Sequence, residues 1–165
     1  VLFRTFARAR RTCEEIAILM NSELYRDLGV ARFVTAFIVC IDRASREVSY
    51  VNAGHGDVLC AYDDRSECFA STSPPLGIVG SDMFSPSQGV LPFGDWRLWI
   101  VTDGISEAEL NGAEIGMDGM RARAGRYKDL SLQDAVNHTL DLIRKQKLVT
   151  SDDATLVVVD TRTIQ

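Results

Sequence analysis

The chain has 165 residues, of which 46% are hydrophobic and 25% charged, and its formal net charge at pH 7 is −5. This length and apolar content are enough to bury a substantial core and predict one domain. The acidic balance gives no electrostatic footprint for nucleic acid or for an anionic membrane, and no apolar run approaches the roughly 18 residues of a membrane span. The N-terminus has no export-signal pattern, so a cytoplasmic location is predicted.

The four cysteines, Cys13, Cys40, Cys60 and Cys68, show no Cys-x-x-Cys spacing of the kind that holds zinc. Cys40 lies inside an apolar run, where a free thiol behaves as a small hydrophobic side chain. An intracellular chain keeps such thiols reduced. We therefore expect four reduced cysteines that serve packing, without disulfide bonds or a zinc site.

The first part of the chain predicts one helix followed by strands in hairpin order. Thr12-Cys-Glu-Glu15 has the form of a helix capping box, and apolar residues follow at helical spacing to about Leu28. The run 33–41 is apolar on both alternating faces and rich in β-branched and aromatic residues, which predicts a strand covered on both sides. Further strands over 47–53 and 58–62 complete a predicted β-meander.

The remainder alternates between strands and helices. Strand-like segments lie around Cys68, Phe84 and Val90, over 96–102, and after Asp153. Helical segments are predicted over 106–110, 117–123 and 132–148, the last preceded by the capping signal Ser131-Leu-Gln-Asp134. Strands in hairpin order with helices before and after them predict an α+β fold, in which sheets meet sheets and helices cover the outsides.

Two aspartates are the strongest candidates for chemistry. Asp103 follows the apolar strand and Asp152 precedes the final one. If these two strands are antiparallel neighbours, the end of the first meets the start of the second, and both carboxylates reach one edge of a sheet. Carboxylate oxygens are ligands that hard divalent cations prefer. The sequence therefore predicts that Asp103 and Asp152 bind a metal ion.

Five short segments then occur in a characteristic order: Phe33-Val-Thr-Ala36, Asn52-Ala-Gly-His55, Pro75-Leu-Gly77, Thr102-Asp-Gly104 and Ser151-Asp-Asp-Ala-Thr155. This series resembles the SpoIIE-like, sigma-factor-regulating serine phosphatases of the metal-dependent protein phosphatase superfamily. The resemblance extends over residues 12–159. It implies an αββα sandwich of two mainly antiparallel sheets flanked by helices, with a metal centre at one edge.

The resemblance also implies roles for single residues. Asp103 matches the family's metal-binding aspartate before glycine, and Asp152 matches the metal ligand near the C-terminus. In this superfamily two Mn²⁺ or Mg²⁺ ions activate a water that attacks phosphorus in line, so no catalytic side chain beyond the metal ligands is implied. The implied function is a phosphoserine/phosphothreonine protein phosphatase, with a phosphorylated anti-sigma-factor antagonist of bacterial partner switching as its substrate.

One family segment has no counterpart. The Gly-Asp-x-Ser-Gly-His-Gly pattern, which contributes to the metal pair in the family, is absent from residues 1–165. We expect these residues to be the C-terminal fragment of a longer, N-terminally incomplete domain. There are two alternatives. The missing segment is a separate polypeptide, or the chain is a degenerate family member without catalysis. The corresponding alternative functions are a noncatalytic protein-interaction module and a simple cation-binding domain.

Other residues of the motifs have structural interpretations. Asp153 is a reserve metal ligand that equally suits a cap of the final strand. Asn52 and Gly54 are expected to shape a turn, and His55 to satisfy a backbone group in an ordered loop. The segment 74–77 is expected to pack as a loop rather than to bind a ligand.

Overall fold

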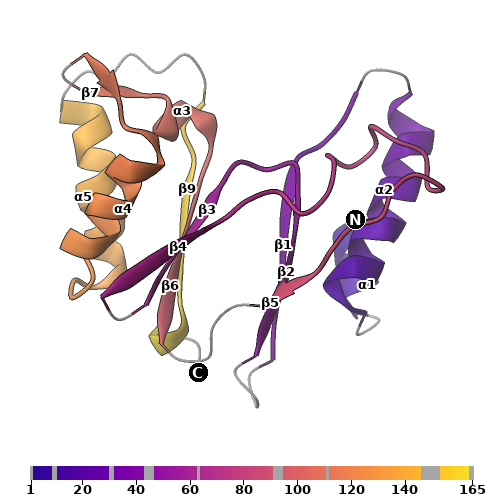
Figure 1. Ribbon diagram of the computed structural model, residues 1–165, viewed down its shortest axis with the longest axis horizontal. Helices are drawn as coiled ribbons and strands as arrows, with labels where there is room; N and C mark the ends of the chain where they lie inside the picture. The colour runs from indigo at the N-terminus through magenta and orange to yellow at the C-terminus, as the bar shows by residue number, and fades with distance from the viewer. Residues whose placement is uncertain are drawn as a thin grey trace. The chain divides into compact units, whose positions relative to one another are not determined.

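The computed structural model describes residues 2–8, 11–29, 32–42, 47–62, 64–90, 95–110, 112–145 and 153–163. The chain divides into two compact units (Figure 1). The first comprises Val1–His55 and Ala70–Phe93, and the second comprises Gly56–Phe69 and Gly94–Gln165. Each unit has its own antiparallel sheet and its own hydrophobic core.

The first unit contains helices α1 (Leu2–Arg8) and α2 (Cys13–Leu28) and a sheet in the order β1-β2-β5. Its strands are β1 (Ala36–Ile41), β2 (Val48–Ala53) and β5 (Gly89–Val90). The predicted capping box starts α2. The Glu15 amide donates to Thr12 Oγ1 over 3.2 Å, and the Thr12 amide donates to Glu15 Oε2 over 2.9 Å.

The core of the first unit lies between α2 and its sheet. Residues three and four apart on the helix face the strands, because that spacing repeats once per helical turn. The buried residues of this core are Cys13, Ile16, Ala17, Ile38, Val51, Ala53, Leu76 and Phe84. Buried Asn21 fastens the loop after the core strands: its Nδ2 donates to the Val79 carbonyl over 3.2 Å, and its Oδ1 accepts from the Gly77 amide over 2.8 Å.

The second unit has a four-stranded sheet in the order β4-β3-β6-β9. Its strands are β3 (Val58–Tyr62), β4 (Arg65–Phe69), β6 (Trp96–Val101) and β9 (Leu156–Asp160). Its helices are α3 (Asp103–Ser106), α4 (Gly116–Arg126), α5 (Leu132–Lys145) and the 3₁₀ turn η1 (Thr161–Thr163). A small hairpin joins β7 (Glu109–Leu110) to β8 (Ala113–Glu114).

Helices α4 and α5 lie along one face of this sheet (Figure 1). The buried core there is Leu59, Trp99, Val101, Ile105, Ala108, Ile115, Met120, Ala124, Tyr127 and Ala135. Helix α5 begins as predicted, because the Asp134 amide donates to Ser131 Oγ over 3.1 Å. The predicted α+β class with two antiparallel sheets and covering helices is confirmed. None of the helices among the described residues is long and apolar enough to cross a membrane.

Three element predictions were wrong. The meander breaks after β2, since β3 pairs with β4 and β6 in the other sheet. Phe84 is in no strand: its amide donates to the Gly80 carbonyl in a turn, which buries the ring without a ladder. The helical turn expected over 106–110 is α3, four residues long and ending at Ser106, because the following residues find a hairpin partner across Gly112.

The turn after β2 leaves no room for a side chain at Gly54. Its φ is +66°, and an added Cβ would lie 2.4 Å from Pro75 Cγ. Gly29 has the same backbone angle, φ +67°, with nothing within 4 Å of an added Cβ. We expect Gly29→Ala to lower the free energy of unfolding by about 1 kcal/mol, through backbone strain alone. Gly54→Ala should cost roughly 2 kcal/mol more, because of the clash. Urea unfolding measures both, and equal losses would contradict the Gly54–Pro75 contact.

Candidate functional site

Asp103 stands where β6 turns into α3. The strand ends at Val101, Thr102 is the N-cap with extended backbone angles, and Asp103 is the first helical residue. The side chain of Asp103 is exposed, and its Oδ1 accepts a hydrogen bond from the Gly104 amide over 2.9 Å. In the part of the chain that the structure describes, its second oxygen has no hydrogen-bond donor. An exposed carboxylate held on one side suits the oxygen chemistry of a hard cation.

The end of β6 meets the start of β9, so the condition on which the metal hypothesis rests is met. The strands are antiparallel neighbours, with Val101 opposite Leu156. Beyond the ladder, the Thr102 amide donates to the Thr155 carbonyl over 3.1 Å, and the Thr155 amide donates to Thr102 Oγ1 over 2.8 Å. The Thr102 hydroxyl in turn donates to the Asp153 carbonyl over 3.1 Å. The residue before Asp103 therefore ties down the segment that leads into β9.

Asp152, the second predicted ligand, lies outside the described residues. Its approach to Asp103 therefore stays a prediction. Asp153, the reserve ligand, is described and exposed. Within the described ranges, no group of three or more histidine, cysteine, aspartate or glutamate side chains is placed to hold a metal ion. Of the two predicted ligands, only Asp103 is described, and its metal-binding role stays a prediction.

The other motif residues form a scaffold in the first unit. The buried Asn52 accepts, through its carbonyl, from the amides of Thr72 over 2.8 Å and Ser73 over 3.1 Å. The Gly54 amide donates to Ser71 Oγ over 3.0 Å. These bonds hold the loop that contains Pro75 against the end of β2, which agrees with a turn-shaping role. His55 is half-buried, and its Nε2 has no hydrogen-bond partner among the described residues, so the expected backbone bond is not made by that atom.

Sequence reasoning missed a buried ion network at the other end of β6. Arg97 is 5% exposed and Asp160 is 2% exposed, and they are directly opposite each other on β6 and β9. Arg97 Nε and Nη2 both donate to Asp160 Oδ2, over 2.9 and 2.7 Å. Arg162 donates to both oxygens of the same carboxylate, over 3.0 and 2.8 Å. The available signal was a charged residue inside an apolar strand, which needs an opposite charge when it is buried.

Arg97 also holds the helical layer. Its Nη1 donates to the Tyr127 carbonyl and its Nη2 to the Leu130 carbonyl, each over 3.0 Å. These carbonyls lie in the connection between α4 and α5. One side chain thus joins the sheet to the segment that positions both helices.

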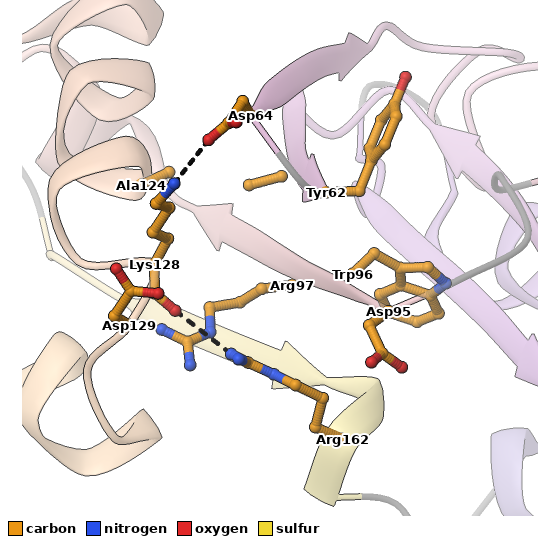
Figure 2. A pocket seen from close by; sticks show the side chains of 10 residues that line it. Tyr62, Asp64, Asp95, Trp96, Arg97, Ala124, Lys128, Asp129 and Arg162 are labelled. Atoms are coloured by element: carbon orange, nitrogen blue, oxygen red, sulfur yellow. Dashed lines mark hydrogen bonds and ion pairs between the residues drawn. The ribbon is translucent and has the colours of Figure 1, made fainter.

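A cavity of about 390 Å³ opens beside this network (Figure 2). Its lining residues are Ala61, Tyr62, Asp64, Asp95, Trp96, Arg97, Ala124, Lys128, Asp129 and Arg162. Figure 2 shows Lys128 directed toward Asp64, and the two form an ion pair of 2.5 Å. Arg97 and Arg162 share Asp160. Because its cations are paired within the protein, this cavity has no unbalanced positive charge for an anionic ligand. It lies near the start of β6, roughly 20 Å along the strand from Asp103.

The network sets the ionisation of Asp160. Burial alone would raise the pKa of its carboxyl group, but hydrogen bonds from Arg162 and Arg97 outweigh burial and lower the pKa to about 2, from an ordinary value of 3.8. Asp160 is therefore ionised throughout the physiological range and stabilises the folded chain in that form.

Known proteins resemble this chain in sequence. The model of the family described as Stage II sporulation protein E (SpoIIE) matches residues 1–162. The phosphoserine phosphatase RsbP of Bacillus subtilis is 30% identical over 98 residues, which is 59% of this chain and 24% of RsbP. The chain thus spans about a quarter of the length of that curated relative.

Solved structures share the fold, among them two phosphatase domains. The SiaA-PP2C domain of Pseudomonas aeruginosa has a TM-score of 0.72 at 14% identity, over 90% of this chain and 59% of that domain. The phosphatase domain of SpoIIE from Bacillus subtilis, Mn presoaked, has a TM-score of 0.63 at 20% identity, over 96% of this chain and 70% of that one. The two antiparallel sheets with helices are therefore the fold of PP2C-type phosphatases.

The Thr102 hydroxyl should stabilise the segment that leads into β9. Thr102→Val keeps the shape but removes the partner of the Thr155 amide and of the Asp153 carbonyl. We expect a loss of about 1–2 kcal/mol in unfolding free energy and roughly tenfold faster hydrogen exchange at the Thr155 amide. Thr102→Ser keeps the hydroxyl and should leave that exchange rate near wild type. Unchanged exchange in the valine variant would contradict the tie.

The contribution of Asp160 to the free energy of unfolding should depend on pH. A depressed pKa contributes stability above the unfolded value of about 3.8, and this contribution is lost as the pH falls toward the folded value of about 2. Asp160→Asn should lower the free energy of unfolding by about 3 kcal/mol at pH 6, because it breaks a buried pair. The difference from wild type should shrink by about 1 kcal/mol at pH 3.

Urea unfolding at both pH values measures this difference. The control Asp129→Asn removes an exposed carboxylate at the same cavity and should change stability little. A wild-type advantage that stays constant between pH 6 and pH 3 would show that Asp160 is not the acid-sensitive group.

Proposed function

The chain belongs to the SpoIIE family, and from this membership we propose that it works as a metal-dependent phosphoserine/phosphothreonine protein phosphatase domain. The observation that supports the proposal most is the pairing of β6 with β9. This pairing puts the end of β6, two residues before Asp103, beside the segment that enters β9. The name of the relative RsbP, a phosphoserine phosphatase, supports the same reaction.

Asp103 and Asp152 would hold Mn²⁺ or Mg²⁺. Carboxylate oxygens suit either ion, and a related phosphatase domain was studied after soaking with Mn. A divalent cation lowers the pKa of bound water and offsets charge on the transferring phosphoryl group. The contribution of this chain is positional. The Gly104 amide orients Asp103, and Thr102 holds the segment next to Asp152.

Two aspartates do not complete a two-metal centre, because Mg²⁺ and Mn²⁺ take about six ligands each. The proposal therefore includes further ligands from a segment with the family's Gly-Asp-x-Ser-Gly-His-Gly pattern, which residues 1–165 do not contain. In this view the chain is the C-terminal part of the phosphatase domain.

The proposed substrate is a phosphorylated protein of the anti-sigma-factor antagonist type, in cytoplasmic partner switching. Asp103 is exposed at the edge of a sheet rather than enclosed. An open edge suits a phosphate presented on the surface of another protein, whereas a small metabolite is usually surrounded by a pocket. The cavity beside Arg97 is at the far end of β6, and its cations are already paired.

The test is Mn²⁺-dependent phosphate release from a phosphoserine-bearing antagonist protein. The assay uses the full protein encoded by the natural reading frame that contains residues 1–165. Asp103→Asn and Asp152→Asn should each lower kcat on the order of 100-fold or more, because each removes a charged metal ligand. Asp129→Asn removes the same charge from the other end of the sheet and should keep wild-type turnover.

Turnover unchanged in both ligand variants would reject the assigned roles. Turnover absent even from the wild-type protein, with a partner retained in a pull-down regardless of metal, would favour the noncatalytic interaction module. Circular dichroism of each variant separates loss of a ligand from loss of the fold.

A further inference from the structure

Two of the four cysteines converge in the first unit. Cys13 is in the first turn of α2, and Cys40 is in β1, where its side chain packs against the cluster that contains Cys13. Cys40 and Ser49 are directly opposite each other on β1 and β2. Opposite residues of an antiparallel pair point to the same face of the sheet. Cys40 and Ser49 therefore both face α2.

The contacts of Cys13 place its sulfur over this pair. Cys13 Sγ donates to the Ser49 carbonyl over 3.4 Å and lies 3.8 Å from Ser49 Oγ. Cys13 Sγ therefore lies next to Ser49, the residue directly opposite Cys40. Both thiols are free. The structure thus places two free thiols beside Ser49, in the core between a helix and an edge strand.

The other cysteines show that this is not a general property of the sheets. Cys60 on β3 is opposite Glu67, and Cys68 on β4 is opposite Leu59. Because adjacent positions alternate between faces, Cys60 and Cys68 point to opposite faces of their sheet. Cys68 is half-buried like Cys40, which makes it a matched control.

We propose that Cys13 and Cys40 are a dithiol oxidation site, at which a peroxide forms a disulfide bond that joins α2 to β1. This site is independent of the proposed phosphatase chemistry. Its ligand class is a small hydroperoxide, and hydrogen peroxide is the simplest member.

With hydrogen peroxide the reaction balances as two thiols and one peroxide giving one disulfide and two waters; an organic hydroperoxide would release an alcohol in place of the first water. The Cys40 sulfur attacks one peroxide oxygen: an S–O bond forms, the O–O bond breaks, and the first water leaves after taking up the thiol proton. The Cys13 sulfur then attacks the Cys40 sulfur: an S–S bond forms, the S–O bond breaks, and the second water leaves with the Cys13 proton. The two sulfurs lose two electrons, which reduce the peroxide.

The two cysteines differ in burial, as this order of reaction steps requires. Cys13 is 0% exposed, and burial is the main cause that raises the pKa of its thiol to about 12. It stays protonated near neutral pH and reacts second. Cys40 is half-buried, so a small oxidant reaches it first. The disulfide would close a loop over residues 14–39 and fix the first turn of α2 on the sheet.

The experiment treats the folded chain with hydrogen peroxide, blocks remaining thiols, and digests it with trypsin without reduction. The expected product is a disulfide-linked pair of peptides 12–26 and 33–43, which carry Cys13 and Cys40. The same pair should appear in Cys68→Ser and be absent from Cys40→Ser. The midpoint of thermal unfolding should rise by roughly 5–10 °C in wild type and return after dithiothreitol, because the link restricts the unfolded chain.

Two results would overturn the proposal. One is Cys40 recovered as sulfinic or sulfonic acid while Cys13 remains a blocked thiol. The other is a linked peptide that forms only in urea, where the folded contact is lost.

Discussion

The second unit depends on the pairing of β6 with β9. Different side-chain bonds hold the two strands together at the two ends of this pair. At one end Arg97 and Asp160 neutralise each other inside the protein, and Arg97 also binds the connection between α4 and α5. At the other end Thr102 bonds to the backbone of the segment that enters β9. The first closure stabilises the layer of helices on the sheet. The second fixes the surroundings of Asp103, where the proposed chemistry belongs.

The division of labour between ends follows from charge. A buried ion pair is costly to break, so the Arg97–Asp160 end is suited to structure and not to exchange of ligands. An exposed carboxylate with one oxygen held by the Gly104 amide keeps the other oxygen available to a cation. The motif residues of the first unit also have structural roles, since the hydrogen bonds of Asn52 and Gly54 hold a loop against the end of β2.

Local rules predicted local structure well. The capping residues Thr12 and Ser131 start α2 and α5 as expected, because a cap is a contact within one turn. Alternation could not tell that β2 and β3 belong to different sheets, since it reports faces and not partners. The partner of Arg97 was equally hidden, because it depends on a register between distant strands. The pairing of β6 with β9, which the metal hypothesis assumed, is present in the structure, whereas Asp152 lies outside the described residues.

The most direct test of the central claim is a Mn²⁺ titration followed by the backbone amide resonances of the isotopically labelled protein. A paramagnetic ion broadens the signals of nearby nuclei. If the edge formed by Asp103 and the entry to β9 holds the cation, the amides of Gly104 and Thr155 broaden first. Arg162, at the opposite end of the pair of strands, then stays sharp. Broadening that starts around Arg162, or that is equal at both ends, would contradict a metal site at this edge.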